Sequence, residues 1–310
     1  MDEKKMSSDF HHSLLVPCYN AAKYIDRFAL QLSKLTIPFN EVVFYDDGST
    51  DETIFLLEKK GFKVIKGLIN KGPGYARNRL AYEAKGEYIH FHDIDDEIDS
   101  DFLKLINQKL TLCDTDVILG YADWIDEISR ASLILWTYDE MAIKKNPLAY
   151  FMSKPLGIIN TVYKKSTFLN IGGFNENIKC WEDADLHIRL AAVQANFQVV
   201  NEIIAHSLRH ANGISKDQEK CWRCRLRFLE IYLNVYLDKV DKDIFKQELK
   251  KVQTVFINMG TYRLLKKIFD LNKKYQLDLS TNKAKMLYYS SSLIPSSWLQ
   301  KVISFAQRSR

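Results

Sequence analysis

The sequence predicts an α/β fold: a mainly parallel sheet covered by helices on both faces, followed by a helical C-terminal extension. Strand and helix patterns alternate four times in the first 115 residues. The predicted strands are apolar at consecutive positions, which is typical of strands buried on both faces of a parallel sheet. Near residue 216 the pattern changes to amphipathic helices with Lys and Arg on their polar side.

A change in charge separates these two parts of the chain. The 310 residues carry a net charge of +5. Residues 216–310 contain 20 basic and 9 acidic side chains, a charge of +11, which leaves −6 for residues 1–215. We therefore expect two domains, a sheet domain at 1–215 and a basic helical extension at 216–310, with different partners.

The elements of the first domain are predicted from apolar runs and from the residues that end them. The run at 13–20 ends after Pro and Asn, and the run at 41–50 ends in Asp-Asp-Gly-Ser-Thr, so each is a strand that enters a turn. Gly61 ends the helix that begins at 51, and Gly86 ends the helix that begins at 72. The same patterns predict helices at 21–35 and 99–113, and strands at 62–67, 87–93 and 116–126.

Polar side chains follow three of these strands. Asn20 follows the first strand, Asp46 and Asp47 end the second, and Asp93–Asp96 follow the fourth. Because ligands of open parallel sheets bind at the carboxyl ends of the strands, we expect these side chains to face one crevice.

The carboxylates of Asp93 and Asp95, two residues apart, are a candidate metal site. Hard oxygen ligands suit Mg²⁺ or Mn²⁺, and such an ion would offset the repulsion between neighbouring carboxylates. The alternative is a solvated acidic loop that caps the helix beginning at residue 99.

Three further groups each have a functional and a structural interpretation. Asp46 and Asp47 can bind a nucleobase or ribose, or they can form an ordinary turn before the next helix. Arg77 can approach a phosphate, or it can be a helix-surface arginine. Glu182 and Asp183 begin a helix pattern, where a carboxylate is often a cap, but one that faces a substrate hydroxyl can be a general base.

Between residues 13 and 215 five blocks follow one another: SLLVPCYNAAKYI, VVFYDDGSTDET, NKGPGYARNRLAYEAKGEYIHFHDIDD, IGGFNENIKCWEDADLHIRLA and LRHANGIS. In this order they resemble the signatures of glycosyltransferase family 2. The resemblance implies the GT-A fold, a Rossmann-like α/β fold, and the inverting transfer of a sugar from a nucleotide-diphospho-sugar. It does not extend to the C-terminal third of the chain.

The resemblance also implies a donor pocket. Asp46 and Asp47 would contact the base and ribose of the nucleotide, with Asp47 the stronger candidate. Pro17 and Tyr19 would line the same pocket, and Arg77 would lie near the nucleotide.

Metal binding and catalysis are implied for a second set of residues. Asp95 would bind the Mn²⁺ or Mg²⁺ that bridges the two phosphates, Asp93 would touch this metal or the ribose, and His210 would reach the metal or the diphosphate. Asp183 would be the base that deprotonates the acceptor hydroxyl, and Glu182 would orient it.

The expected function is therefore an inverting, metal-dependent hexosyl- or N-acetylhexosaminyl-transferase. A UDP-sugar is the expected donor, because UDP is the family's commonest nucleotide. A glycan or lipid-linked hydroxyl in cell-surface polysaccharide synthesis is the expected acceptor. One alternative is an inactive nucleotide- or glycan-binding protein of the same fold. A second is a nucleotidyltransferase, but the Gly-rich loop with a basic residue, usual after the first strand of that class, is missing from 13–25.

The basic helices of 216–310 suggest two roles: packing on the catalytic domain, or attachment to an anionic membrane surface. No nucleic-acid motif accompanies the charge, so we expect no nucleic-acid partner. No apolar run approaches the roughly 18 residues of a membrane span, and residues 1–12 lack an apolar signal core. We expect a cytoplasmic protein, which in the second of these two roles would attach peripherally to the inner face of the plasma membrane.

Overall fold

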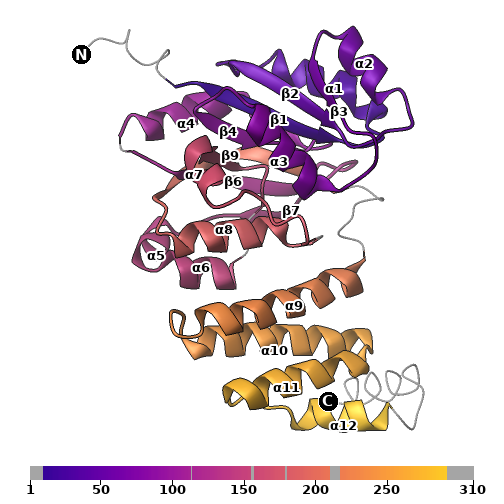
Figure 1. Cartoon of the computed structure of the whole chain (residues 1–310), viewed down its shortest axis with the longest axis vertical. Coiled ribbons are helices and arrows are strands. Elements are labelled where there is room, and N and C mark those ends of the chain that lie inside the picture. The colour runs from indigo at the N-terminus through magenta and orange to yellow at the C-terminus, as the bar shows by residue number, and fades with distance from the viewer. Residues whose placement is uncertain (1–9, 113, 155–156, 179, 210–216, 292–310) are drawn as a thin grey trace. The chain divides into compact units, whose positions relative to one another are not determined.

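The computed structural model describes residues 10–112, 114–154, 157–178, 180–209 and 217–291. The chain divides into two compact units, Met1–Gly213 and Ile214–Arg310 (Figure 1). The domain boundary expected at residues 215 and 216 lies outside the described residues.

The first unit is built on one sheet, to which the described residues contribute nine strands in the order β3-β2-β1-β4-β8-β6-β9-β5, with β7 paired to β6. The strands are β1 (His12–Cys18), β2 (Glu41–Asp46), β3 (Lys63–Lys66), β4 (Tyr88–Phe91), β5 (Glu97–Ile98), β6 (Val117–Asp126), β7 (Ser132–Trp136), β8 (Thr161–Lys164) and β9 (Phe197–Arg209). The helices of this unit are α1 (Ile25–Leu32), α2 (Thr53–Lys59), α3 (Pro73–Glu83), α4 (Phe102–Leu110), α5 (Glu140–Lys145), α6 (Pro147–Ser153), α7 (Lys165–Asn170) and α8 (Glu182–Ala192).

The parallel part of the sheet consists of its first four strands and of the pair β6 and β9. Between β4 and β6 the short strand β8 runs antiparallel to both neighbours, and β5 runs antiparallel to β9. The predicted α/β fold is therefore confirmed, with a parallel N-terminal half and a mixed second half.

Helices cover both faces of the sheet, as the apolar strands predicted. Leu14, Leu15 and Val16 of β1 are all buried, and successive side chains of a strand point to opposite faces. Leu14 and Val16 join the core cluster that contains Phe28 of α1 and Phe102 of α4. The helix α3 packs on β1 and β2.

Two glycines show where local prediction succeeds and where it fails. Gly61 has a left-handed backbone, φ 79°, just after α2, as expected of a residue that ends a helix. The prediction that Gly86 ends α3 was wrong, because the helix stops at Glu83. Gly86 instead allows a close approach to β1, since a Cβ atom at this position would lie 2.5 Å from Oγ of Ser13.

The second unit consists of α9 (Gln218–Tyr236), α10 (Lys242–Met259), α11 (Leu265–Tyr275) and α12 (Asn282–Ser290) within the described residues. The predicted amphipathic helices are confirmed: apolar side chains such as Leu229 and Phe256 are buried. A buried ion pair joins α9 to α10, with 2.8 Å between Arg225 and Glu248. Across both units, no helix that the structure describes is long and apolar enough to cross a membrane.

Candidate active site

The strand ends of the parallel half bring acidic side chains to one point. The thiol of Cys18, the last residue of β1, is buried there. Burial raises the pKa of this thiol well above its ordinary value, and nearby carboxylates raise it further: Asp46, Asp93, Asp95 and Asp51. These carboxylates lie at or after the ends of β2 and β4, so the carboxyl ends of the parallel strands are acidic, as expected.

The turn after β2 contains the two carboxylates predicted to contact the nucleotide. Asp46 is fully buried; its Oδ2 accepts the backbone N–H groups of Gly48 and Ser49 at 3.1 and 2.9 Å. Its Oδ1 is buried without a hydrogen-bond partner among the described residues. Asp47 is buried as well, and its carboxylate accepts the N–H groups of Lys71 and Gly72, which fixes the loop before α3. A buried acceptor left unpaired costs free energy, so Oδ1 of Asp46 is suited to a donor on a ligand.

The end of β1 provides the other two residues of the predicted donor pocket. Pro17 lies opposite Tyr45 in the β1–β2 ladder. Tyr19 follows the strand and is half exposed, with 50% of its surface accessible. Asn20 then adopts a left-handed backbone, φ 49°, and its Oδ1 accepts the N–H of Thr50 at 2.8 Å. The turns after β1 and β2 are thereby tied together beside Tyr19.

The acidic loop after β4 divides into one structural and two accessible carboxylates. Asp96 is buried, and its Oδ1 accepts the N–H of Leu208 on β9 at 2.8 Å. Burial, together with the charges of Asp93 and Asp95, raises the pKa of Asp96 well above its ordinary value. Asp93 and Asp95 are only partly buried. The loop is therefore anchored to β9 by Asp96, and the predicted metal ligands remain on its accessible side.

Arg77 of α3 connects this loop to the acidic start of α8. Its Nη2 lies 2.8 Å from Asp93, and its Nη1 lies 3.1 Å from Glu182. The side chain is buried, and its guanidinium lies 5.5 Å from the ring centre of Phe174. Burial alone would lower the pKa of Arg77, but these carboxylates outweigh it and raise the pKa. The arginine expected near the nucleotide thus forms a bridge between Asp93 and Glu182.

The start of α8 holds the predicted base. Trp181, which precedes the helix, has φ 70° and ψ 23°, a left-handed conformation that is strained for a bulky residue. Asp183 accepts the N–H of Ala184 at 2.8 Å. Burial, and then the charge of Glu182, raises the pKa of Asp183 to about 7, against the opposing effect of Arg77. A carboxyl with this pKa is available as a proton acceptor near neutral pH.

A buried histidine fixes the backbone of Asp183. Nδ1 of His187 lies 2.7 Å from the carbonyl oxygen of Asp183, and its Nε2 lies 2.9 Å from the hydroxyl of Tyr163 on β8. A carbonyl oxygen only accepts, so Nδ1 carries the proton and Nε2 accepts from the tyrosine. Burial lowers the pKa of His187 to about 3, which keeps the ring neutral.

The loop before α8 is held by residues that the sequence analysis did not identify as positioning groups. Nδ2 of Asn78 donates to the carbonyl of Phe174 at 2.9 Å, and its Oδ1 accepts the N–H of Phe174 at 2.8 Å. Arg189 of α8 donates to the carbonyl of Gly173 at 2.7 Å. Asn78 adjoins Arg77 in α3. This helix therefore contacts both the carboxylates of Asp93 and Glu182 and the loop at Phe174. The Gly-Gly-Phe at 172–174 was the only sequence signal for this contact.

The strands β6 and β7 present an aromatic pair that the sequence analysis also missed. The rings of Trp124 and Trp136 stack with 4.9 Å between their centres, and the guanidinium of Arg209 lies 4.1 Å from the ring centre of Trp124. Nearby, Asn160 donates to the hydroxyl of Tyr138 at 2.7 Å. Burial, and to a smaller extent the charge of Asp183, raises the pKa of the Tyr138 hydroxyl above its ordinary value.

The carboxylates of Asp93 and Asp95 suit a hard divalent ion that also binds oxygen atoms of a substrate. In the described part of the chain, no three His, Cys, Asp or Glu side chains are arranged to hold a metal by themselves. His210 lies outside the described residues. Mg²⁺ and similar ions are commonly held by one or two carboxylates and complete their shell with water and substrate phosphates. Asp93 and Asp95 fit this second kind of site.

The comparisons with known proteins agree with this fold. Residues 13–162 match the family described as Glycosyl transferase family 2. The chain is 32% identical over 179 residues to the poly(ribitol-phosphate) beta-N-acetylglucosaminyltransferase TarS of Staphylococcus aureus (strain Mu50), a match that covers 55% of this chain and 30% of TarS. It is 27% identical over 207 residues to the chondroitin synthase of Escherichia coli, which covers 66% of this chain and 29% of the synthase. The chain spans less than a third of the length of each of these relatives.

A crystal structure of an S. aureus TarS fragment in complex with UDP-GlcNAc has the same fold. Its TM-score is 0.58 at 24% identity, over 78% of this chain and 71% of that one. The parallel strands and the acids at their ends define a Rossmann-like α/β domain. The domain has the GT-A fold, and its residues 13–162 are similar to glycosyltransferase family 2.

The bridge formed by Arg77 predicts a specific loss of stability. Arg77→Lys keeps the charge, but an ammonium cannot reach Asp93 and Glu182 together. We expect the free energy of unfolding in urea to fall by about 2 kcal/mol. The control variant Arg227→Lys, at an exposed arginine of α9, should lose less than about 0.5 kcal/mol. Equal stability of the two variants would contradict the bridge.

Proposed function

We propose that the protein transfers a sugar from a nucleotide-diphospho-sugar to a hydroxyl of a glycan or lipid-linked acceptor, with inversion at the anomeric carbon. The observation that carries the proposal is the bridge of Arg77, which joins the acids at the end of β4 to Glu182 and Asp183. A UDP-sugar is the proposed donor, because TarS has been crystallised with UDP-GlcNAc. The names of TarS and chondroitin synthase support an acceptor in cell-surface polysaccharide synthesis.

The proposed nucleotide pocket lies at the ends of β1 and β2. We assign Oδ1 of Asp46, which is buried without a hydrogen-bond partner among the described residues, as the acceptor for a donor on the base or ribose. Asp47 holds the loop at Lys71 by accepting its N–H, and its carboxylate would accept a further hydrogen bond from the nucleotide. Pro17 and the half-exposed Tyr19 would cover the ring of the base.

The proposed metal site is formed by Asp95 and Asp93, with His210 as a third ligand. Mn²⁺ or Mg²⁺ bound there would neutralise the charge that develops on the leaving diphosphate. Arg77 holds Asp93 in place through its 2.8 Å contact, so the loop does not depend on the ion for its position.

The proton transfer is assigned to Asp183. The acceptor oxygen forms a bond to the anomeric carbon as the bond from this carbon to the diphosphate oxygen breaks. The diphosphate leaves with the electron pair, and Asp183 takes the proton of the attacking hydroxyl. Attack opposite to the leaving group inverts the configuration. Glu182 and Arg77 orient the start of α8, and the hydrogen bond from His187 to the carbonyl of Asp183 fixes the backbone there.

The acceptor is proposed to bind on the side of β6 and β7. The stacked rings of Trp124 and Trp136 are only partly buried and offer a flat apolar surface to a sugar ring. Arg209, which lies against Trp124, would favour an acceptor that carries negative charge.

Replacing the base tests the mechanism. Asp183→Asn preserves the shape of the side chain but cannot accept a proton, so we expect turnover of UDP-GlcNAc to fall by about 10³-fold. UDP binding should not change, and the melting temperature at pH 8 should be equal or higher, because a buried charge has been removed. The exposed variant Glu202→Gln should keep its rate. Near-normal turnover in Asp183→Asn would remove this residue from the base role.

The rate should depend on pH through Asp183. Only the ionised carboxylate accepts a proton, so with a pKa of about 7 the rate should rise as pH increases up to 7 and level off above it. Burial raises this pKa first and the charge of Glu182 second. Glu182→Gln removes the second cause and should move the rising limb to lower pH. If the rising limb of the pH–rate profile does not move in Glu182→Gln, a group other than Asp183 controls the rate.

Removal of metal tests the role of Asp95. We expect EDTA to stop turnover and Mn²⁺ or Mg²⁺ to restore it. Asp95→Asn should need a higher Mn²⁺ concentration for half-maximal rate, whereas Asp123→Asn, on β6, should not. Full activity of the wild type in EDTA would refute the metal assignment.

We also infer a peripheral attachment of the second unit to the inner face of the plasma membrane. Lysines are frequent on α10, α11 and α12, and apolar side chains such as Val235 and Met286 are exposed, at 57% and 62%. The stretch from 286 to 310 mixes Tyr, Trp and apolar residues with terminal arginines, as a membrane-facing segment would, and its residues 292–310 lie outside the described residues.

Flotation with liposomes tests this attachment. The protein should float with vesicles that contain anionic lipid at low salt and remain behind with neutral vesicles, because the attraction is electrostatic and screened by salt. Failure to float with anionic vesicles at low salt would exclude it.

A further inference from the structure

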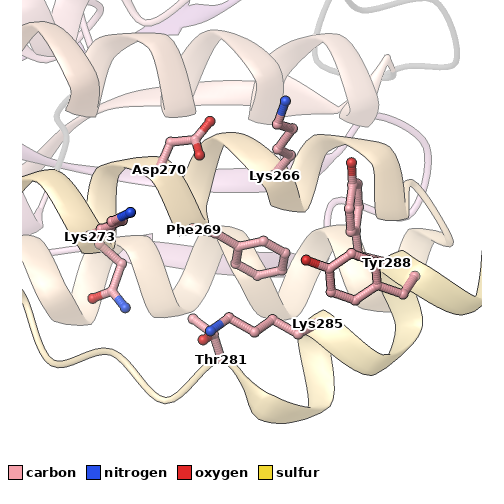
Figure 2. A pocket seen from close by; sticks show the side chains of 9 residues that line it. Lys266, Phe269, Asp270, Lys273, Thr281, Lys285 and Tyr288 are labelled. Carbon is pink, nitrogen blue, oxygen red and sulfur yellow. The ribbon is translucent and has the colours of Figure 1, made fainter.

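The second unit contains a half-open pocket of about 380 Å³ between α11 and α12. Figure 2 shows Phe269 in its centre, with Lys266 and Lys273 along α11 and with Lys285 and Tyr288 contributed by α12. Asp270 of α11 also lines it. The volume is that of a site for a small ligand or for one or two units of a polymer.

The two walls of the pocket share one side-chain pattern. Lys266 and Phe269 are three positions apart on α11, and Lys285 and Tyr288 are three positions apart on α12. Residues at this spacing lie on the same face of a helix. The core of the unit uses other positions of α11, namely Leu265, Ile268 and Leu271. The pocket is therefore lined by a face of α11 that differs from its core-facing side and carries lysine and aromatic side chains.

The pocket lysines differ from other lysines of the same helix in their partners. Lys267 pairs with Glu230, and Lys274 donates to Asn234 at 3.1 Å. By contrast, the ion pairs found in the described part of this unit do not include Lys266, Lys273 or Lys285. Three ammonium groups around one concave surface, with a single carboxylate among them, favour an anionic ligand.

The aromatic rings and Asp270 narrow the class of ligand. Phe269 and Tyr288 meet edge to face, with 5.8 Å between their centres, and Tyr289 stands next to Tyr288 with 65% of its surface exposed. Such rings offer apolar surface to the C–H groups of a sugar. A carboxylate would repel a bare phosphate, but it accepts hydrogen bonds from hydroxyl groups. A ligand that carries both hydroxyl groups and a negative charge would suit Asp270 as well as the three lysines.

We propose that this pocket binds an acidic sugar unit of a glycan chain. The sugar ring lies against Phe269 and Tyr288, and a hydroxyl donates to Asp270. The carboxylate or phosphate group of the unit meets Lys266, Lys273 and Lys285. This is a second glycan site, separate in the chain from the proposed donor and acceptor residues, and it goes beyond the proposed transfer reaction.

The test measures binding to the full chain by calorimetry, without nucleotide. The probes are three hexasaccharides: a hexamer of galacturonic acid, a phosphorylated glucan hexamer, and neutral maltohexaose. We expect the acidic probes to bind and the neutral probe to bind at least about tenfold more weakly. The stronger of the two acidic probes identifies the anionic group as carboxylate or phosphate.

Two matched triple variants locate the site. Lys266→Gln with Lys273→Gln and Lys285→Gln should weaken binding of the acidic probe by about tenfold, because three exposed charge contacts are lost. The control removes the same charge from the same helices outside the pocket, through Lys267→Gln, Lys274→Gln and Lys283→Gln, and should keep its affinity. Tyr289→Ala should weaken binding of the acidic probe as well.

Three outcomes would overturn the proposal. Equal losses in both triple variants would mean that the attraction is general to the basic surface. Equal binding of the acidic and neutral probes would remove the role of the lysines. Loss of binding to anionic vesicles in the pocket variant, with probe binding unchanged, would assign the pocket to the membrane. Because the assay needs neither donor nor turnover, its result is independent of the transfer reaction.

Discussion

The buried guanidinium of Arg77 is the interaction on which the candidate site depends. One positive charge lies among Asp93, Glu182 and Asp183, so the cluster has more negative than positive charge. Burial, together with this excess of negative charge, raises the pKa of Asp183 to about 7. The same excess makes the loop after β4 attractive to a cation. The bridge thus explains how carboxylates that repel one another lie in one site. The remaining negative charge is suited to accepting a proton and to binding a cation.

The groups around the site are held by contacts that do not take part in the proposed reaction. Asp96 anchors the acidic loop to Leu208, and His187 joins the first turn of α8 to Tyr163. Asp96 and His187 are both buried and hydrogen-bonded within the domain, so their positions are fixed before any ligand arrives. Preorganisation of this kind lowers the cost of orienting reacting groups.

Much of the fold could be predicted from the sequence, because the parallel half consists of local patterns. Each apolar run and each turn after it is contained in about ten residues, and strand ends of a parallel sheet meet by geometry. The antiparallel insertion of β8 could not be predicted, because it depends on pairings with β4 and β6 that are distant in sequence. The same limit applies to the acids. Which of Asp93, Asp95 and Asp96 is structural depends on the N–H of Leu208, 112 residues further on.

The contact between Asn78 and Gly173 couples two distant parts of the sequence. Gly173 has φ 64°, and a Cβ atom there would collide with Oδ1 of Asn78. A larger residue at 173 is therefore compatible with the fold only if position 78 becomes smaller and the backbone relaxes. Among homologous chains these two positions should vary as a pair, and a change at one alone would be passed along the loop to the first turn of α8.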